Sequence, residues 1–239
     1  MATTAATRTK AKINGKSDGS WVGRKLKRKE DPRMIRGITH YTDDLKLAGM
    51  VHCAFARSPH AHAEIKAIRT EAAKSVPGVL AVFTSEDTAE LGPVPCAMQM
   101  PDLKIPRHPA LATGRVRYVG EPVAVIVAED IYTARDAAEL IEVDYEPLPI
   151  VTDMEKALTK DSPLVHDDCK SNQAFTHTLK NGDIEAAFKK ADRVVKQRML
   201  NQRLAPIAIE PRAVLAEYLP GENRLTVWSS TQSPHLLKT

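Results

Sequence analysis

Pro122-Val-Ala-Val-Ile-Val-Ala128 is the stretch of this chain that decides the fold. Successive side chains of a strand point to opposite faces of a sheet, so a strand with one face in water alternates apolar and polar residues. This run is apolar at every position. It therefore predicts a strand inside a sheet that is covered on both faces, and the burial of its Val and Ile side chains makes it the centre of the folded core.

Strand and helix patterns lie on both sides of this run. Before it, residues 50–56, 63–69 and 79–83 are predicted strands, and residues 70–76 form a short helix between the last two. After it, a strand over 142–146 follows a helix whose apolar residues have the spacing of one helical face, with Asp130 or Thr133 as its N-cap. A strand–helix–strand unit over 123–146 predicts a right-handed crossover.

The second half of the chain has a different pattern. Residues 150–181 are polar and rich in turn residues, which indicates a long connection between domains. A helix capped by Asp183 and ending near Ala191 comes next, and strands are predicted over 193–201, 213–218 and 224–229, the last two joined by a turn at 220–223. One helix cannot cover both faces of a sheet of three strands, so this second unit is expected to be incomplete.

Composition and charge exclude several classes of protein. The chain has 239 residues, of which 43% are hydrophobic, so it can bury a core. Its net charge of +4 comes from residues 1–40, which carry +8 and leave −4 for the remainder. A basic tail and only 5% aromatic residues do not indicate nucleic acid binding by a folded face. A tail that binds polyanions remains the third hypothesis for the function.

The location of the protein is predicted from features that the sequence lacks. No run approaches the roughly 18 apolar residues of a membrane span, and the N-terminus does not resemble an export signal. Cys53, Cys96 and Cys169 are odd in number and far apart, which fits a reducing compartment and not a disulfide framework or a metal knuckle. We therefore expect a cytoplasmic protein without a membrane span.

Polar pairs in the sequence are candidates for a site, and most have a structural explanation. His60 and His62 would share one face of a strand and could bind a metal, but no third ligand is near them in sequence, so packing or capping in a loop is the leading interpretation. The pairs Asp43-Asp44 and Asp167-Asp168 lie in polar loops and are expected to be solvated. Glu210 and Arg212 flank a proline, and we expect a structural ion pair there.

Gln232 is the residue that we select as a candidate cofactor ligand. It follows the strand predicted over 224–229 and lies in the polar loop Ser229-Ser-Thr-Gln-Ser-Pro234. A side-chain amide offers two N–H donors and one acceptor, so a glutamine at the end of a strand can donate to an oxo or phosphate group while its carbonyl is held elsewhere. The alternative for this residue is an ordinary exposed glutamine.

Several short motifs occur in one order and resemble a known family. They are Ala56-Arg-Ser-Pro-His-Ala-His-Ala63, Val116-Arg-Tyr-Val-Gly-Glu-Pro122, Ile209-Glu-Pro-Arg-Ala213 and Leu225-Thr-Val-Trp-Ser-Ser-Thr-Gln-Ser-Pro-His235. The first two resemble the α/β hammerhead domain of the molybdenum subunit in the xanthine dehydrogenase, aldehyde oxidase and aerobic carbon monoxide dehydrogenase family. The last two are similar to the start of the molybdopterin-binding region of that family. The resemblance covers about residues 22–239.

The resemblance implies an α+β fold with four regions. These are a flexible basic N-terminal arm over 1–30, an α/β hammerhead domain over 31–150, a linker over 151–181, and the incomplete start of a molybdopterin-binding α/β domain over 182–239. The layout resembles the large subunits of carbon monoxide dehydrogenase-like enzymes. Their electrons leave through a separate Fe-S subunit and an FAD-binding subunit.

The activity that the resemblance implies is oxidative hydroxylation of carbon monoxide, an aldehyde or an N-heterocycle at a molybdenum-molybdopterin cofactor. Gln232 takes the position of the glutamine that hydrogen-bonds the ligand sphere of the metal. The Gly-rich segment, the other pterin contacts and the catalytic glutamate of the family lie beyond Thr239, so this chain supplies no catalytic residue. Alone, it is expected neither to retain the cofactor nor to turn over. The second hypothesis is a stand-alone, non-catalytic hammerhead-type module that binds other proteins.

Overall fold

A computed structural model describes residues 22–237, which fall into two compact units. One unit contains the described residues up to Leu45 together with Ala208–Ser230, and the other contains Lys46–Ile207 together with the residues from Thr231 onward. Most of the arm predicted over residues 1–30 lies outside the described residues. None of the helices within 22–237 has the length and apolarity needed to cross a membrane.

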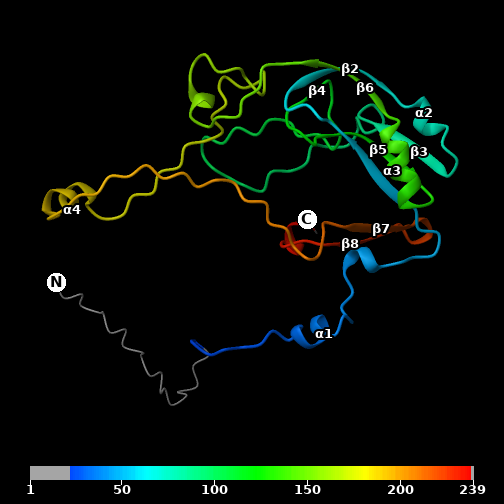
Figure 1. Cartoon of the computed structure of the whole chain (residues 1–239), viewed down its shortest axis with the longest axis horizontal. Coiled ribbons are helices and arrows are strands. Elements are labelled where there is room, and N and C mark those ends of the chain that lie inside the picture. Colours follow the sequence, from blue (N-terminus) through cyan, green and yellow to red (C-terminus); the bar gives the residue numbers. More distant parts are fainter. Residues whose placement is uncertain (1–21, 238–239) are drawn as a thin grey trace, which may run out of the picture. The chain divides into compact units, whose positions relative to one another are not determined.

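The centre of the larger unit is a three-stranded sheet with the order β1-β5-β3 (Figure 1). Its strands are β1 (His52–Arg57), β5 (Pro122–Ala128) and β3 (Val79–Thr84), and β5 runs antiparallel to both neighbours. Ile126 is 0% exposed and lies between Ala54 on β1 and Val82 on β3. The prediction that residues 122–128 form a central strand without an exposed face is confirmed.

Two helices pack against this sheet. They are α2 (Glu71–Lys74) and α3 (Ile131–Glu139), and their buried residues Ala73 and Ala137 meet Ile126 in one cluster. Small alanine side chains allow the helices to approach the strands closely. The predicted N-cap of α3 is confirmed, because Asp130 accepts hydrogen bonds from the backbone N–H groups of Tyr132 and Thr133 at 2.8 and 2.9 Å.

Removal of this cap gives a prediction about the dependence of stability on pH. Hydrogen bonds from Thr133 hold the pKa of Asp130 below its usual value, so the carboxylate stabilises the fold at neutral pH and this contribution is lost as the pH falls through the lowered pKa. We expect Asp130→Ala to lower the midpoint of thermal unfolding at pH 7, and Asp130→Asn, which keeps an acceptor, to lower it less. The difference in the midpoint of thermal unfolding between the wild type and Asp130→Asn should become smaller at acidic pH. Equal midpoints for all three proteins at pH 7 would contradict this account.

A second three-stranded sheet of the larger unit has the order β4-β2-β6. Its strands are β4 (Arg115–Val116), β2 (Ala63–Arg69) and β6 (Glu142–Pro147), and both pairs are antiparallel. The predicted right-handed crossover over 123–146 is therefore wrong, because β5 and β6 belong to different sheets. The handedness rule applies to parallel strands of one sheet, and no such pair joins these two strands.

The residues after β6 contain little regular structure. They include η2 (Lys156–Leu158) and α4 (Ile184–Lys190), and Asp183 caps α4 as predicted by accepting from the N–H of Ala186. The strand predicted over 193–201 is wrong, since residues 191–209 have no strand partner and are exposed. An isolated extended segment cannot satisfy its backbone groups by pairing, so its strand propensity alone does not form a sheet.

The smaller unit contains a β-hairpin of β7 (Val214–Leu219) and β8 (Arg224–Ser229). Its described helices are α1 (Asp31–Ile35), η1 (Thr42–Asp44) and η3 (Pro220–Glu222), and η3 forms the predicted turn. Asn223 ends this turn with a φ of 46°, a left-handed conformation that asparagine tolerates better than most residues. A last short helix, α5 (Pro234–Leu237), belongs to the larger unit.

One face of the hairpin is apolar and exposed. Cross-strand pairs place its side chains opposite each other, and four of them are between 52% and 70% exposed: Val214, Tyr218, Leu225 and Val227. An apolar sheet face of this kind is normally buried against another layer of structure.

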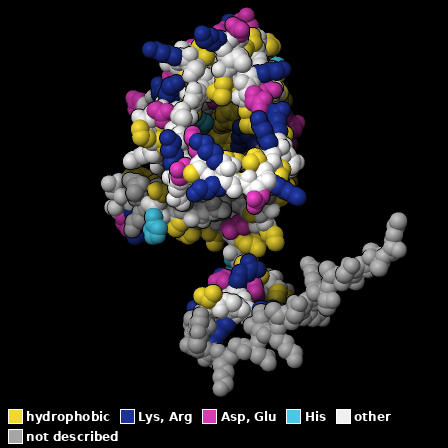
Figure 2. Space-filling model, turned by 90° about the vertical axis from the view of Figure 1, so that its left-hand side faces the viewer, with side chains coloured by type: hydrophobic (Ala, Val, Ile, Leu, Met, Phe, Trp, Pro, Cys, Tyr) yellow, Lys and Arg dark blue, Asp and Glu magenta, His cyan; other side chains and the backbone are white. Residues whose placement is uncertain are grey.

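On the face of the molecule in Figure 2, acidic and basic side chains are interspersed and hydrophobic side chains lie between them.

Candidate functional site

The loop that carries Gln232 begins where β8 ends. Ser230 accepts a hydrogen bond from the N–H of Ala213 through its Oγ at 2.9 Å, and this hydroxyl donates to the carbonyl of Pro211 at 3.0 Å. The N–H of Ser230 donates to the carbonyl of Ala213 at 3.1 Å. The hydrogen bonds of Ser230 therefore hold the end of β8 against the segment that precedes β7. Ser230 is also the residue at which the loop to Gln232 begins.

Glu210 has a partner that the sequence did not predict. Its Oε1 accepts from both the N–H and the hydroxyl of Thr42 at 3.2 Å. The expected ion pair between Glu210 and Arg212 is wrong, because the described residues contain no such pair and the carboxylate instead binds the first N–H of η1. Free N–H groups at the start of a helix attract carboxylates, which explains this choice of partner.

Gln232 lies in the bend between β8 and α5, and its side chain is exposed. No described residue makes a hydrogen bond to its amide, so two donors and one acceptor are available to a ligand. These properties fit a polar group of a cofactor, and they would equally fit water. Gln232 as a cofactor ligand therefore stays a prediction.

A second group of polar residues is buried where the two sheets of the larger unit meet. Ser58 and Glu121 are 2% and 5% exposed. The N–H of Ser58 donates to the carbonyl of Glu121 at 2.9 Å, and the N–H of Gly120 donates to the carbonyl of Ser58 at 2.8 Å. The Glu121 carboxylate accepts from the N–H of Arg117 at 2.5 Å. These bonds hold the loop after β1 against the turn before β5.

The two histidines that were considered as metal ligands have structural partners. The ring of His60 packs on the ring of Tyr145, with centroids 4.8 Å apart. His62 is 6% exposed, its Nδ1 lies 2.8 Å from the carbonyl oxygen of Pro149, and its own carbonyl accepts from the N–H of Leu148. Within residues 22–237, no group of three His, Cys, Asp or Glu side chains could hold a metal ion. Both histidines therefore fix the loop between β1 and β2.

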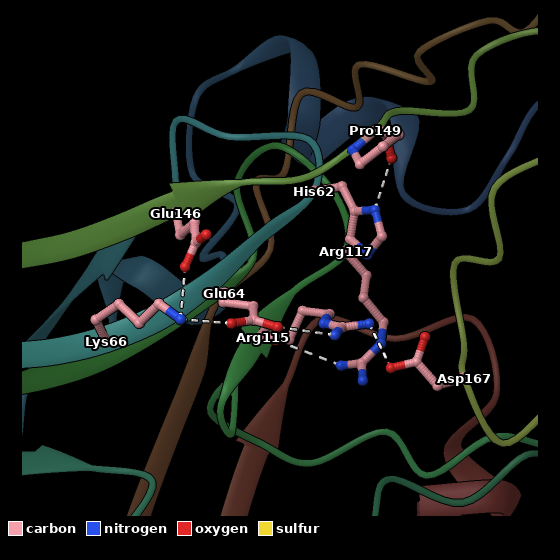
Figure 3. A network of polar contacts seen from close by, with 8 residues as sticks. All are labelled: His62, Glu64, Lys66, Arg115, Arg117, Glu146, Pro149 and Asp167. Atoms are coloured by element: carbon pink, nitrogen blue, oxygen red, sulfur yellow. Dashed lines mark hydrogen bonds and ion pairs between the residues drawn. The ribbon is translucent and has the colours of Figure 1, made fainter.

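A charged network crosses the second sheet (Figure 3). Glu64 on β2 accepts from Lys66 at 2.7 Å and from Arg115 on β4 at 3.2 Å, and Lys66 also reaches Glu146 on β6 at 2.6 Å. Arg115 binds Asp167 at 2.5 Å, so one carboxylate of the predicted solvated pair Asp167-Asp168 has an ion-pair partner. The other predicted pair is also partly engaged, since Asp44 accepts from the N–H of Tyr41.

This network has a structural role and offers no acid–base pair. A hydrogen bond from Lys66, and then its charge, keep the pKa of Glu64 below its usual value, and Glu146 is the main cause of a raised pKa at Lys66. Both groups therefore stay charged at neutral pH. The network joins the strands of the sheet to the segment around Asp167, and sequence reasoning did not predict Glu64, Lys66 or Arg115 as partners.

Glu121 gives a prediction about stability. Glu121→Ala leaves the N–H of Arg117 without an acceptor in a buried setting, and we expect it to lower the free energy of unfolding by about 1–3 kcal/mol. Glu155→Ala is a suitable control, because this residue forms an exposed ion pair with Arg198 that is worth less than about 1 kcal/mol. Urea unfolding followed by circular dichroism measures both effects. Equal losses in the two variants would show that the Glu121 contact does not stabilise the fold.

Comparison with known proteins assigns the two halves of the chain. Residues 36–149 match the family described as the a/b hammerhead domain of aldehyde oxidase and xanthine dehydrogenase. Residues 165–239 match the molybdopterin cofactor-binding domain family.

The chain belongs to the xanthine dehydrogenase and aldehyde oxidase family. Among its relatives, the carbon monoxide dehydrogenase large chain of Afipia carboxidovorans is 39% identical over 231 residues, which cover 91% of this chain and 28% of that protein. The nicotine 6-hydroxylase large subunit of Paenarthrobacter nicotinovorans is 36% identical and covers 91% of this chain and 27% of that protein. This member of the family therefore spans little more than a quarter of the length of these relatives.

Solved structures of the family confirm the predicted fold. Quinoline 2-oxidoreductase from Pseudomonas putida 86 superposes with a TM-score of 0.78 at 36% identity, over 87% of this chain and 26% of that one. Carbon monoxide dehydrogenase from Oligotropha carboxidovorans gives a TM-score of 0.74 at 39% identity, over 90% of this chain and 28% of that one. The α+β fold, with a hammerhead domain and the start of a molybdopterin-binding domain, is thus confirmed together with the family.

Proposed function

We propose that this chain forms part of the large subunit of a molybdenum hydroxylase and that Gln232 contributes to its cofactor site. The observation that carries the proposal is the position of Gln232, which lies inside the segment that matches the molybdopterin cofactor-binding family and whose amide makes no hydrogen bond to a residue within 22–237. When bound, the molybdenum-molybdopterin cofactor supplies two-electron oxidation and oxygen transfer. Gln232 donates its N–H groups to a polar group of the cofactor and orients it.

The residues that precede Gln232 in sequence support this role by fixing the end of β8. Ser230 holds the start of the loop through its bonds to Pro211 and Ala213. Glu210 reaches Thr42 from the same segment, so the segment before β7 is held at a second point. A glutamine on an anchored loop loses less conformational freedom when it binds than one on a free loop.

The substrate of the complete enzyme is carbon monoxide, an aldehyde or an N-heterocycle, and its electrons pass to an Fe-S subunit and an FAD-binding subunit. Relatives described as large subunits and large chains support this assembly. Three cysteines without a disulfide among them support a cytoplasmic location.

We further propose that the described fold needs more of the large subunit before it can hold the cofactor or turn over. The exposed apolar face of the hairpin supports this, because side chains such as Val214 and Leu225 are 70% and 62% exposed. The unpaired segment 191–209 supports it as well, with Val195, Ile207 and Ile209 each more than 85% exposed. The small share of the relatives that the chain spans agrees with this proposal.

The proposal is tested by producing the complete large subunit together with the Fe-S and flavin subunits encoded with it. We expect iron and flavin to purify with the subunit, and we expect one of the three substrate classes to reduce an artificial electron acceptor. A folded subunit that recruits neither partner and reduces no acceptor would overturn the proposal. That outcome would favour the stand-alone hammerhead module instead.

A further inference from the structure

His62 has a buried ring nitrogen that no described residue uses. Its Nδ1 lies 2.8 Å from a carbonyl oxygen, so Nδ1 carries the proton and donates to Pro149. Its Nε2 is buried without a hydrogen-bond partner in residues 22–237, and the residue is only 6% exposed. A buried polar atom of this kind is rare in native proteins and indicates a missing partner.

Arg117 also has a buried side-chain nitrogen without a hydrogen-bond partner among the described residues. Its Nη1 donates to the carbonyl of Arg115 at 3.3 Å, whereas its Nε is buried without a hydrogen-bond partner in the described part of the chain. No described carboxylate forms an ion pair with this guanidinium, unlike Arg115, which has both Glu64 and Asp167. The edge formed by Nε and Nη2 is the edge that binds carboxylate and phosphate oxygens in pairs.

Both groups affect the pKa of His166. Burial lowers the pKa of His166, and the positive charge of Arg117 lowers it further, with smaller contributions from His108 and His62. Asp168 acts in the opposite direction. Figure 3 shows His62 above the side chain of Arg117, at the end of the charged network that is remote from Lys66. The basic side chains that act on His166 therefore outnumber the one carboxylate, Asp168, which is exposed.

We propose that His62 and Arg117 form a binding site for a small oxyanion of the phosphate or carboxylate class. The half-buried guanidinium needs an anion, because a charge withdrawn from water without a counter-ion is costly. The Nε and Nη2 groups of Arg117 donate to two oxygens of the anion, and Nε2 of His62 binds a third group. The site does not include Gln232 and does not depend on the proposed function.

The geometry requires a proton between His62 and the anion. Because Nδ1 already donates to Pro149, Nε2 of the neutral ring can only accept a hydrogen bond. An anion that carries an O–H, as monobasic phosphate does, can donate to Nε2, and a carboxylate ion cannot. Monobasic phosphate is more abundant at pH 6 than at pH 8, so affinity should rise as the pH falls. The other charged or titratable groups near the site are Arg117, His108, His166, Asp168 and Glu121, whose carboxylate accepts from the N–H of Arg117.

Isothermal titration of the full chain with inorganic phosphate, and separately with acetate, tests the site. We expect saturable binding of phosphate at one site, tighter at pH 6 than at pH 8. Arg117→Gln should weaken it at least about tenfold, because it removes a charged donor pair. Acetate distinguishes the two anion classes: weaker saturable binding assigns a general oxyanion site, and no binding of acetate assigns a phosphate site. Absence of saturable binding of both anions would overturn the proposal.

Two further variants keep the test decisive. His62→Asn retains a donor for Pro149 and removes Nε2, so we expect it to fold and to lose most of the pH dependence of binding. Arg198→Gln removes an arginine that is 80% exposed and should bind phosphate as the wild type does. If Arg117→Gln does not fold, phosphate binding by His62→Asn tests the site instead. Phosphate binding by His62→Asn with unchanged affinity and unchanged pH dependence would contradict the site.

Discussion

Replacing Ile126 with alanine is expected to lower the free energy of unfolding by about 2–5 kcal/mol. Ile126 is 0% exposed, lies on the central strand β5 and meets α2 and α3 through Ala73 and Ala137. These neighbours are small and already in close contact, so they cannot fill the space that the lost side chain leaves. Urea unfolding of the full chain measures this loss.

Leu80→Ala is the matched control for this prediction. Leu80 lies on β3 of the same sheet, but its side chain is 56% exposed. We expect its replacement to cost well under half of the loss at Ile126, because most of its surface is already in water. Similar losses in the two variants would show that β5 is not the centre of the core.

Replacing Gln232 with alanine is expected to lower kcat of the complete enzyme by about 100- to 1000-fold, the range seen when one oriented hydrogen-bond donor is removed from an active site. Gln232→Glu should lose a similar amount, since it keeps an acceptor but removes both N–H donors. We expect these effects in kcat more than in KM, because the amide binds the cofactor and not the substrate.

Gln99→Ala provides the control for this second prediction. Gln99 is an exposed glutamine outside the segment that matches the molybdopterin cofactor-binding family. Its replacement should leave kcat unchanged within experimental error. If Gln232→Ala has the same kcat as Gln99→Ala while both enzymes carry the cofactor, Gln232 is an ordinary surface residue.

Local features of the fold were predictable from the sequence because they depend on neighbouring residues. The apolar run 122–128 and the cap at Asp130 are of this kind, and both occur in the structure. Pairing between distant strands was not predictable. β6 joins β2, about 80 residues earlier, and not the sheet of β5, while the segment 193–201 has strand propensity without a partner.

The candidate sites also depended on contacts between residues that are far apart in the sequence. Thr42 and Glu210 are 168 residues apart, so their contact could not be read from the spacing of charges along the chain. The unpartnered nitrogens of His62 and Arg117 become visible only when burial and hydrogen bonds are known. Gln232 was selected through a family resemblance, because a single glutamine at the end of a strand has no distinctive pattern of its own.

The molybdenum content of the complete assembly is the measurement that tests the account most directly. The large subunit, purified with its partner subunits and active in turnover, should contain about one molybdenum atom per copy when analysed by mass spectrometry of the metal. Turnover should fall in proportion when the metal is absent. An assembly that turns over its substrate fully without molybdenum would contradict the proposed function.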